Sequence, residues 1–183
     1  MEKILYVTDL DGTLLNQKDR INEKSLEIIN GLVEEGMLFT YATARSLVSA
    51  SVVTEGLTTK IPVIAYNGAF IFQPDTGEIL SREDFGRDER AHAADVIRAN
   101  GVWPLVYAFV DGVERVSWLS GRENDGITRY LSLRKGDRRL RPVEDDEKLY
   151  QGEIFYFTCI GEKEELWPVY DILSKDERYR CTI

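Results

Sequence analysis

Two carboxylates lie two residues apart at the end of an apolar run, where residues 4–15 read I-L-Y-V-T-D-L-D-G-T-L-L with the acids at Asp9 and Asp11. Residues i and i+2 at a strand end project to the same side. We therefore expect both acids at the carboxyl edge of a sheet, where open α/β sheets bind ligands. Two close carboxylates repel, so one tends to keep its proton while the other stays ionised. The ionised group can act as a nucleophile or metal ligand, and its protonated neighbour as a general acid.

Other interpretations of this pattern are weaker. A calcium EF-hand loop also begins D-x-D, but it has glycine at its sixth position and glutamate at its twelfth. Here Gly12 is the fourth residue of the motif and the preceding element is a predicted strand. A plain acidic turn after a strand is the remaining alternative.

The first eighty residues alternate between strand and helix patterns. A strand over about residues 3–8 precedes a helix that begins near Asn22, a plausible N-cap, and ends at Gly36. Two more buried strands are predicted at 37–42 and 61–66, with a helix over about 46–55 between them. Strands separated by helices predict a parallel α/β layer with right-handed connections.

The pattern changes after residue 68. A hairpin is predicted with strands at 69–72 and 78–81, and a second with Asp111-Gly112 between strands at 103–110 and 113–119. Further elements are predicted as helices at 88–99, 124–133 and 163–173, with strands at 154–160 and 179–183. The basic segment 134–141 is interpreted as a solvated turn.

Composition limits the functional classes. The 183 residues include 32 acidic and 23 basic side chains, a net charge of −9, which argues against nucleic-acid or anionic-membrane binding. The two cysteines lack metal-ligand spacing and are too few for a secreted disulfide framework. No signal-peptide pattern or membrane-spanning apolar run is found, so a cytoplasmic location is predicted.

The run D-L-D-G-T-L-L resembles motif I of the haloacid dehalogenase superfamily, in its Cof-type sugar-phosphatase branch. This resemblance implies that Asp9 attacks phosphorus and that Asp11 protonates the leaving oxygen, then deprotonates the hydrolytic water. It also implies Mg²⁺ as the cofactor, held by the Asp9 carboxylate, the Asp11 backbone carbonyl and a phosphate oxygen. Gly12 and Thr13 of the same motif are implied to bind the phosphate.

Two later segments match the same branch in order. Ala42-Thr43-Ala44-Arg45 follows the second strand where the family carries its motif II Ser or Thr, commonly followed by Gly-Arg. Thr43 and Arg45 match and are implied to bind phosphate, while Ala44 departs from the usual glycine. A Thr that only caps the next helix is the alternative. Asn67-Gly68 matches the Asn-Gly-Ala of this branch, but as a common tight turn it fits a structural role equally well.

The resemblance implies a two-domain organisation: residues 1–82 as the N-terminal part of a haloacid dehalogenase-like Rossmannoid core, and 83–183 as a C2-type α+β cap. The family's later lysine and its Gly-Asp-x-x-x-Asp type motif are not found, so the chain is expected to stop before them. The strand that carries Asp9 should then be a sheet edge with exposed apolar surface, and self-association through it is a hypothesis.

Two functions from different classes follow. The first is a Mg²⁺-dependent phosphatase of small phosphorylated metabolites, such as sugar phosphates, with an aspartyl-phosphate intermediate. The second is a phosphate- or metal-binding fragment without turnover, because each missing charged group can cost about two to three orders of magnitude in rate. A phosphonatase is disfavoured, since the short segment between Asp11 and Asn22 leaves no room for its cap.

Overall fold

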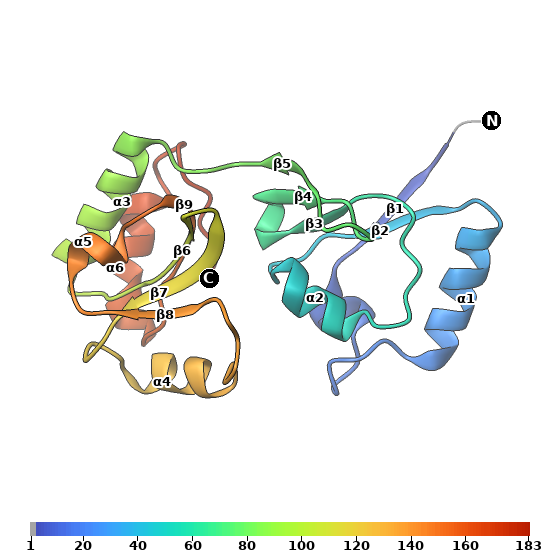
Figure 1. The fold of residues 1–183 in the computed structure, drawn as a ribbon, viewed down its shortest axis with the longest axis horizontal. Helices are drawn as coiled ribbons and strands as arrows, with labels where there is room; N and C mark the ends of the chain where they lie inside the picture. The colour runs from blue at the N-terminus through green and yellow to red at the C-terminus, as the bar shows by residue number, and fades with distance from the viewer. Residues whose placement is uncertain (1–2) are drawn as a thin grey trace. The chain divides into compact units, whose positions relative to one another are not determined.

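A computed structural model describes residues 3–183 of the chain (Figure 1). The chain divides into two compact units, one that ends at Glu83 and one that begins at Asp84. The division lies next to Arg82, where the sequence places a boundary, and the roles of the two units as core and cap stay a prediction. The α/β fold class is confirmed, because the strands form parallel, antiparallel and mixed sheets combined with helices.

The first unit alternates strands and helices as expected. Its elements in chain order are β1 (Leu5–Thr8), the π-type turn η1 (Leu10–Leu14), α1 (Glu23–Glu34), β2 (Leu38–Tyr41), α2 (Leu47–Val53), β3 (Val63–Ala65), the 3₁₀ turn η2 (Tyr66–Gly68), β4 (Phe70–Phe72) and β5 (Ile79–Arg82).

Local sequence signals explain where these helices begin and end. The Asn22 side chain accepts a hydrogen bond from the backbone N–H of Lys24, which confirms it as the N-cap of α1. Gly36 follows the helix with a φ of 103°, the left-handed conformation that ends many helices. Ser46 caps α2 by accepting a hydrogen bond from the N–H of Ser49 at 3.1 Å.

The strands of the first unit are parallel where helices connect them. β1 pairs with β2 in parallel, with Thr8 opposite Tyr41, and a parallel bridge between Ala42 and Ile64 continues the layer to β3. After η2 the chain reverses, so β3, β4 and β5 form an antiparallel sheet that contains the expected hairpin. The carboxyl ends of β1, β2 and β3 therefore lie at the same edge of this layer.

Within residues 3–183, β1 lies at the edge of its sheet, as the family resemblance implies. Among the described residues its one strand neighbour is β2. Four consecutive apolar residues, Ile4 to Val7, are each about half exposed or more. This surface is large for a strand of a layer whose other members are mostly buried.

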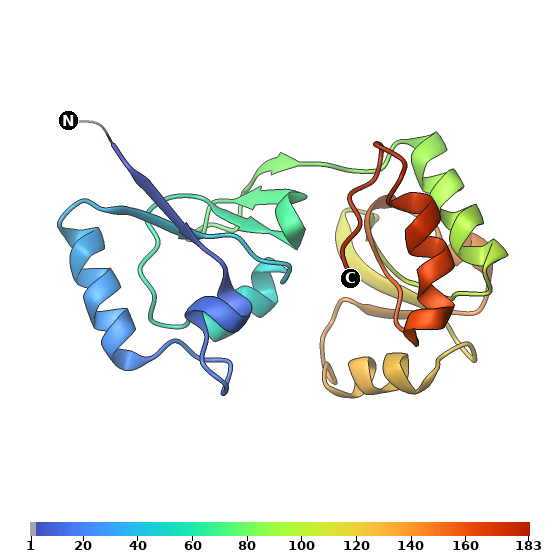
Figure 2. The ribbon, with the colours of Figure 1, turned by 180° about the vertical axis from the view of Figure 1, so that it is seen from behind.

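The second unit contains a four-stranded sheet in the order β8-β7-β6-β9. Helices α3, α5 and α6 lie together on one face of this sheet in Figures 1 and 2, and α3 and α6 share a buried cluster that includes Ile97, Val169 and Leu173. Its elements are α3 (Arg87–Ala99), β6 (Leu105–Val110), β7 (Val113–Leu119), α4 (Asp125–Ser132), β8 (Leu140–Val143), α5 (Asp146–Leu149), β9 (Glu153–Thr158) and α6 (Lys163–Leu173).

Two expectations for this unit are wrong. The segment 179–183 forms no strand; Tyr179 and Cys181 instead pack beside the buried cluster of α3 and α6, which accounts for their alternating apolar pattern. The basic segment is only partly a solvated turn. Its last residues enter β8, and Arg139 is held by Glu114 and Asp137 at 2.7 and 2.6 Å.

Candidate active site

Asp9 and Asp11 lie at a tight turn that follows β1: Asp9 comes directly before the turn and Asp11 is part of it. Asp9 is extended and η1 begins at the next residue, where the fully buried Leu10 anchors the turn. Gly12 has a φ of 74°, a left-handed conformation that glycine adopts without strain. The turn brings the Thr13 hydroxyl to within 3.5 Å of Asp9 Oδ2, so the hydroxyl is placed beside the proposed nucleophile.

Arg45, which follows β2, reaches the Asp11 carboxylate. Its Nε lies 2.9 Å from Oδ2 and its Nη2 lies 2.6 Å from Oδ1, a bidentate ion pair across 34 residues of sequence. The arginine side chain is 22% exposed and that of Asp11 is 49% exposed. Hydrogen bonding from Arg45 lowers the pKa of the Asp11 carboxyl below its usual value.

This pairing bears on which of the two acids keeps its proton. Repulsion between neighbouring carboxylates predicts that one of them does, and the sequence leaves open which one. The guanidinium favours the ionised form of Asp11. In this state the Asp11 carboxylate is arranged as an acceptor of a proton.

Thr43 connects the second and third strands at the same sheet edge. Its side chain is buried at 4% exposure, and its Oγ1 accepts a hydrogen bond from the backbone N–H of Arg45 at 3.1 Å. Its backbone N–H donates to the carbonyl of Ile64, and its carbonyl accepts from the N–H of Asn67 at 3.0 Å. The cap of α2 is Ser46, so Thr43 is not the N-cap residue of that helix.

Asn67 and Gly68 lie in a strained reversal after β3. Asn67 has a φ of 55° and Gly68 a φ of 96°, and the Tyr66 N–H donates to the carbonyl of Arg45 at 3.1 Å. These bonds tie the reversal to the segment after β2. Hydrogen bonds therefore connect the loops after β1, β2 and β3. Arg45 bonds to Asp11 of the first loop, and the Asn67 N–H of the third loop donates to the Thr43 carbonyl of the second.

Two further contacts of Arg45 were not predicted. Its Nη2 lies 3.6 Å from Asp19 Oδ1, and its Nη1 donates to the Ser49 hydroxyl at 3.4 Å. Asp19 lies in the loop before α1 and has a φ of 53°, while Ser49 lies in the first turn of α2. Arg45 precedes the Ser46 cap of α2, so helical i,i+4 spacing gave no signal for this contact.

The donor set fits a hard cation only in part. Among residues 3–183, no group of three His, Cys, Asp or Glu side chains is arranged to hold a metal ion. Mg²⁺, however, is commonly held by one or two carboxylates together with waters and substrate phosphate. The Asp9 carboxylate and the Asp11 backbone carbonyl supply oxygen ligands of that kind, and the residues present fit such an open site.

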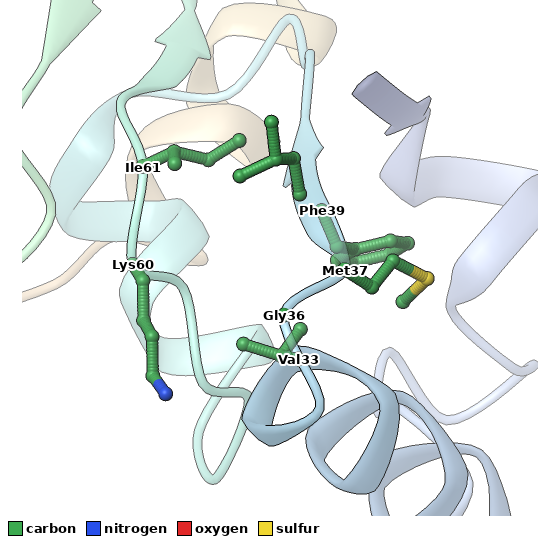
Figure 3. Close-up of a pocket in the computed structure, with 7 residues that line it drawn as sticks. Val33, Gly36, Met37, Phe39, Lys60 and Ile61 are labelled. Carbon is green, nitrogen blue, oxygen red and sulfur yellow. The ribbon is translucent and has the colours of Figure 1, made fainter. Parts of the chain in front are cut away.

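A small pocket lies elsewhere in the first unit. Figure 3 shows its lining, which comes from the end of α1, the start of β2 and the segment before β3: Val33, Gly36, Met37, Leu38, Phe39, Lys60 and Ile61. The Lys60 ammonium is paired with Glu34 at 3.0 Å. The pocket is apolar and lies at the amino end of β2, whereas the acids and Thr43 follow the carboxyl ends of strands, so the pocket is separate from the predicted site residues.

Comparison with known proteins decides the family. The model of the haloacid dehalogenase-like hydrolases matches residues 6–180, nearly the whole chain. The chain belongs to this family. The resemblance inferred from Asp9 to Asn67 is therefore confirmed at the level of the family.

One relative of the chain is named a phosphatase, and a solved structure has a similar fold. The 5-amino-6-(5-phospho-D-ribitylamino)uracil phosphatase YwtE of Bacillus subtilis is 34% identical over 156 residues, which cover 85% of this chain and 50% of the relative. The crystal structure of TM0651 from Thermotoga maritima has a TM-score of 0.68 at 28% identity, covering 95% of this chain and 62% of that protein. The chain thus spans about half the length of its Bacillus relative.

A more distant structural neighbour supports the fold alone. The subclass IIB sugar phosphatase BT4131 has a TM-score of 0.66 at 19% identity, with 93% of this chain and 63% of that protein covered. Within residues 3–183, no helix has both the length and the apolar character needed to cross a membrane.

Proposed function

We propose that this chain carries the first catalytic motifs of a cytoplasmic, Mg²⁺-dependent phosphatase of small phosphorylated metabolites. One observation supports this proposal most strongly: the Asp9–Asp11 turn and the Thr43–Arg45 segment meet at the carboxyl ends of adjacent parallel strands, joined by the bidentate Asp11–Arg45 pair. Ligands bind at that edge in α/β sheets of this kind. We assign three roles within the site: Asp9 attacks phosphorus, Asp11 transfers protons, and the remaining polar groups bind phosphate.

In the first step, an Asp9 carboxylate oxygen attacks phosphorus and the bond from phosphorus to the leaving oxygen breaks. Asp9 suits this role because the Thr13 hydroxyl lies 3.5 Å from its carboxylate and, within residues 3–183, no basic side chain forms an ion pair with it. The leaving oxygen takes a proton from Asp11. An aspartyl-phosphate on Asp9 is the product of this step.

In the second step, Asp11 accepts a proton from water while the water oxygen attacks phosphorus. The bond between phosphorus and the Asp9 oxygen breaks, which releases inorganic phosphate and restores the carboxylate. Asp11 must be protonated for the first step and ionised for the second. The Arg45 pair favours the ionised form, so we propose that Arg45 leaves Asp11 for the substrate phosphate when substrate binds.

The remaining polar groups are proposed to hold the phosphate. The hydroxyls of Thr13 and Thr43 and the backbone at Gly12 supply hydrogen-bond donors, while Asn67 and Gly68 border the same edge. Mg²⁺, held by the Asp9 carboxylate and the Asp11 carbonyl, would offset the repulsion between the nucleophile and an anionic phosphate. Residues 83–183 are proposed as a cap that contributes to substrate choice.

The substrate class follows from the relatives. The Bacillus protein is named for a phosphorylated ribityl compound, and the more distant structural neighbour is named a sugar phosphatase. We therefore propose phosphate monoesters of small polyhydroxylated metabolites as substrates. A site that binds phosphate or metal without turnover is the alternative function.

The test is hydrolysis of p-nitrophenyl phosphate by this chain, with Mg²⁺ and with EDTA, beside Asp9→Asn and the control Asp75→Asn. Asp75 is an exposed acid of the turn between β4 and β5 and is not among the proposed site residues. We expect Mg²⁺-dependent turnover that Asp9→Asn lowers by about a thousandfold or more and that Asp75→Asn leaves unchanged. Turnover that survives in Asp9→Asn would contradict the nucleophile assignment, and phosphate binding without any turnover would favour the alternative.

A further inference from the structure

The chain leaves the extended conformation abruptly at the end of β3. Ala65 is extended, with a φ of −126° and a ψ of 168°. The next three residues are all left-handed, with φ of 51° at Tyr66, 55° at Asn67 and 96° at Gly68. Glycine adopts this conformation without strain and asparagine tolerates it, but for a bulky residue such as Tyr66 it is an outlier. Strained residues of this kind persist only where the surrounding structure holds them, and they cluster at functional sites.

The hydrogen bonds of this turn explain why the chain leaves the strand at Tyr66. The Tyr66 N–H donates to the Arg45 carbonyl at 3.1 Å. The next N–H, that of Asn67, donates to the Thr43 carbonyl at 3.0 Å. In an extended strand alternate residues bond to one neighbour, so two consecutive N–H groups do not face the same side. Here both face the segment after β2, because the backbone turns at Tyr66.

Burial and backbone hydrogen bonds hold Tyr66 in the left-handed conformation. Its side chain is 3% exposed, and its ring centroid lies 5.7 Å from that of Phe70. The Ala69 N–H donates to the Tyr66 carbonyl at 3.1 Å, which closes the turn. These contacts offset the cost of the strained backbone. Asn67, in contrast, is exposed, so the residue type at this position decides how easily the backbone there becomes left-handed.

We infer that the turn Tyr66–Gly68, through its two hydrogen bonds to the Thr43 and Arg45 carbonyls, is a backbone clamp that positions the Arg45 side chain. Asn67 is then a positioning residue that acts through the conformation of its backbone. Arg45 reaches Asp11 through Nε at 2.9 Å and Nη2 at 2.6 Å, and this geometry requires that the Arg45 backbone be held in place. The clamp also places the guanidinium for the phosphate, a part of the inference that rests on the proposed function.

A series of substitutions at position 67 separates the role of the backbone from that of the amide. Asn67→Gly removes the amide but permits the left-handed backbone. Asn67→Val removes the amide and also resists that backbone, because positive φ is an outlier for a β-branched residue. The clamp should therefore stay closed in Asn67→Gly and open in Asn67→Val. Asn67→Ala, which resists the conformation less, replaces Asn67→Val if circular dichroism shows that the latter does not fold.

The measurement is the rate at which the Arg45 Nε–H exchanges with solvent, followed by NMR of the nitrogen-labelled chain. The signal is assigned by its loss in Arg45→Lys. This hydrogen is bonded to Asp11, so its exchange reports how firmly the guanidinium is held. We expect exchange about tenfold faster in Asn67→Val, since the penalty for a left-handed residue with a Cβ corresponds to about a tenfold change in an equilibrium. Asn67→Gly should exchange at the rate of the parent chain.

Asp111→Val is the matched control. Asp111 has a φ of 52°, close to that of Asn67, and lies in the hairpin between β6 and β7 of the other unit. The substitution introduces the same kind of strain away from Arg45, so exchange at Arg45 should not change. Equal acceleration by Asn67→Val and Asp111→Val would show a general loss of stability and would overturn the inference. Unchanged exchange in Asn67→Val would overturn it as well.

Titration calorimetry with inorganic phosphate connects the clamp to the proposed site. Asn67→Val should raise the dissociation constant for phosphate about fivefold, because only chains with a closed clamp bind well, and Asn67→Gly should leave it unchanged. Equal weakening of phosphate binding by the two variants would mean that the amide acts and the backbone does not, which overturns the inference. A parent chain that binds no phosphate would contradict the proposed function, while the exchange rates at Arg45 would still decide whether the clamp exists.

Discussion

Replacing Asp11 with asparagine should strengthen the binding of inorganic phosphate, although Asp11 lies in the proposed active site. In the structure Asp11 occupies the Arg45 guanidinium with contacts of 2.9 and 2.6 Å. If Arg45 serves the phosphate, these contacts must be exchanged when phosphate binds. Asp11→Asn removes the competing charge while the backbone carbonyl proposed to hold Mg²⁺ remains.

The size of the effect follows from the exposure of the pair. The side chains of Arg45 and Asp11 are 22% and 49% exposed, so solvent screens their attraction. Exposed ion pairs contribute about 0.2–1 kcal/mol, and bidentate geometry places this pair near about 1 kcal/mol. Relief of that competition corresponds to a dissociation constant for phosphate that is lower by about fivefold.

Titration calorimetry with inorganic phosphate in the presence of Mg²⁺ measures this constant. Asp19→Asn is the matched control, because it removes the same charge from a group that lies 3.6 Å from Arg45 and is 71% exposed; its effect should be smaller. Arg45→Ala should weaken binding by about tenfold or more, since a hydrogen bond to a charged group contributes about 1.5–3 kcal/mol. Unchanged or weaker phosphate binding in Asp11→Asn would refute the exchange of partners at Arg45.

Three further variants test the site and the fold. Thr43→Val should lower the unfolding free energy by about 1 kcal/mol, because the buried hydroxyl that accepts from the Arg45 N–H is lost, and urea unfolding measures this effect. It should also weaken phosphate binding, which calorimetry measures. Gly152→Ala should destabilise the second unit by about 3 kcal/mol, because its Cβ would approach a backbone carbonyl of β6 to 2.3 Å. Gly101→Ala, also at positive φ but in open space, should cost about 1 kcal/mol. Equal urea midpoints for the two variants would contradict the close packing at Gly152. The hydrogen bond from Arg139 lowers the pKa of Asp137 below its ordinary value of 3.8. The stability from this pair should therefore be fully present above pH 3.8 and be lost as the pH falls below 3.8 through the lowered pKa of the folded state. Asp137→Asn should flatten this acid-side slope in pH-dependent unfolding.

Elements defined by short-range chemistry could be predicted from the sequence. Asn22 and Gly36 bound α1 as expected, and Asp111 and Gly112 adopt φ values of 52° and 75° in the predicted hairpin between β6 and β7. In each case a residue type is matched to a backbone conformation that few others adopt. The edge position of β1 within residues 3–183 was expected from the family resemblance rather than from local sequence patterns.

Elements that depend on tertiary contacts could not be predicted in this way. β8 is a four-residue edge strand that contains Pro142 and is flanked by charged residues, so its local pattern indicates a turn; pairing with β7 decides its conformation. Tyr179 and Cys181 show the opposite case. Their alternating pattern indicates a strand, but these residues form none and instead pack against the buried cluster of α3 and α6.

The site shows the same limit. The positions of Asp9, Asp11 and Thr43 at strand ends followed from the sequence. The pairing of Asp11 with Arg45 joins side chains 34 residues apart and depends on the adjacency of the loops after β1 and β2. The sequence showed that Asp9 and Asp11 are neighbouring carboxylates but not that a guanidinium lies on Asp11, and this guanidinium lowers the Asp11 pKa.

The most direct test of the proposed chemistry is whether phosphorus becomes bonded to Asp9. The chain would be mixed with p-nitrophenyl phosphate and Mg²⁺, quenched in acid within its first turnovers, digested and measured by mass spectrometry. We expect the peptide that contains Asp9 to gain the mass of one phosphoryl group, with the gain absent in Asp9→Asn. Turnover of the substrate with no phosphorylated peptide, or with the phosphoryl group on a residue other than Asp9, would contradict the mechanism.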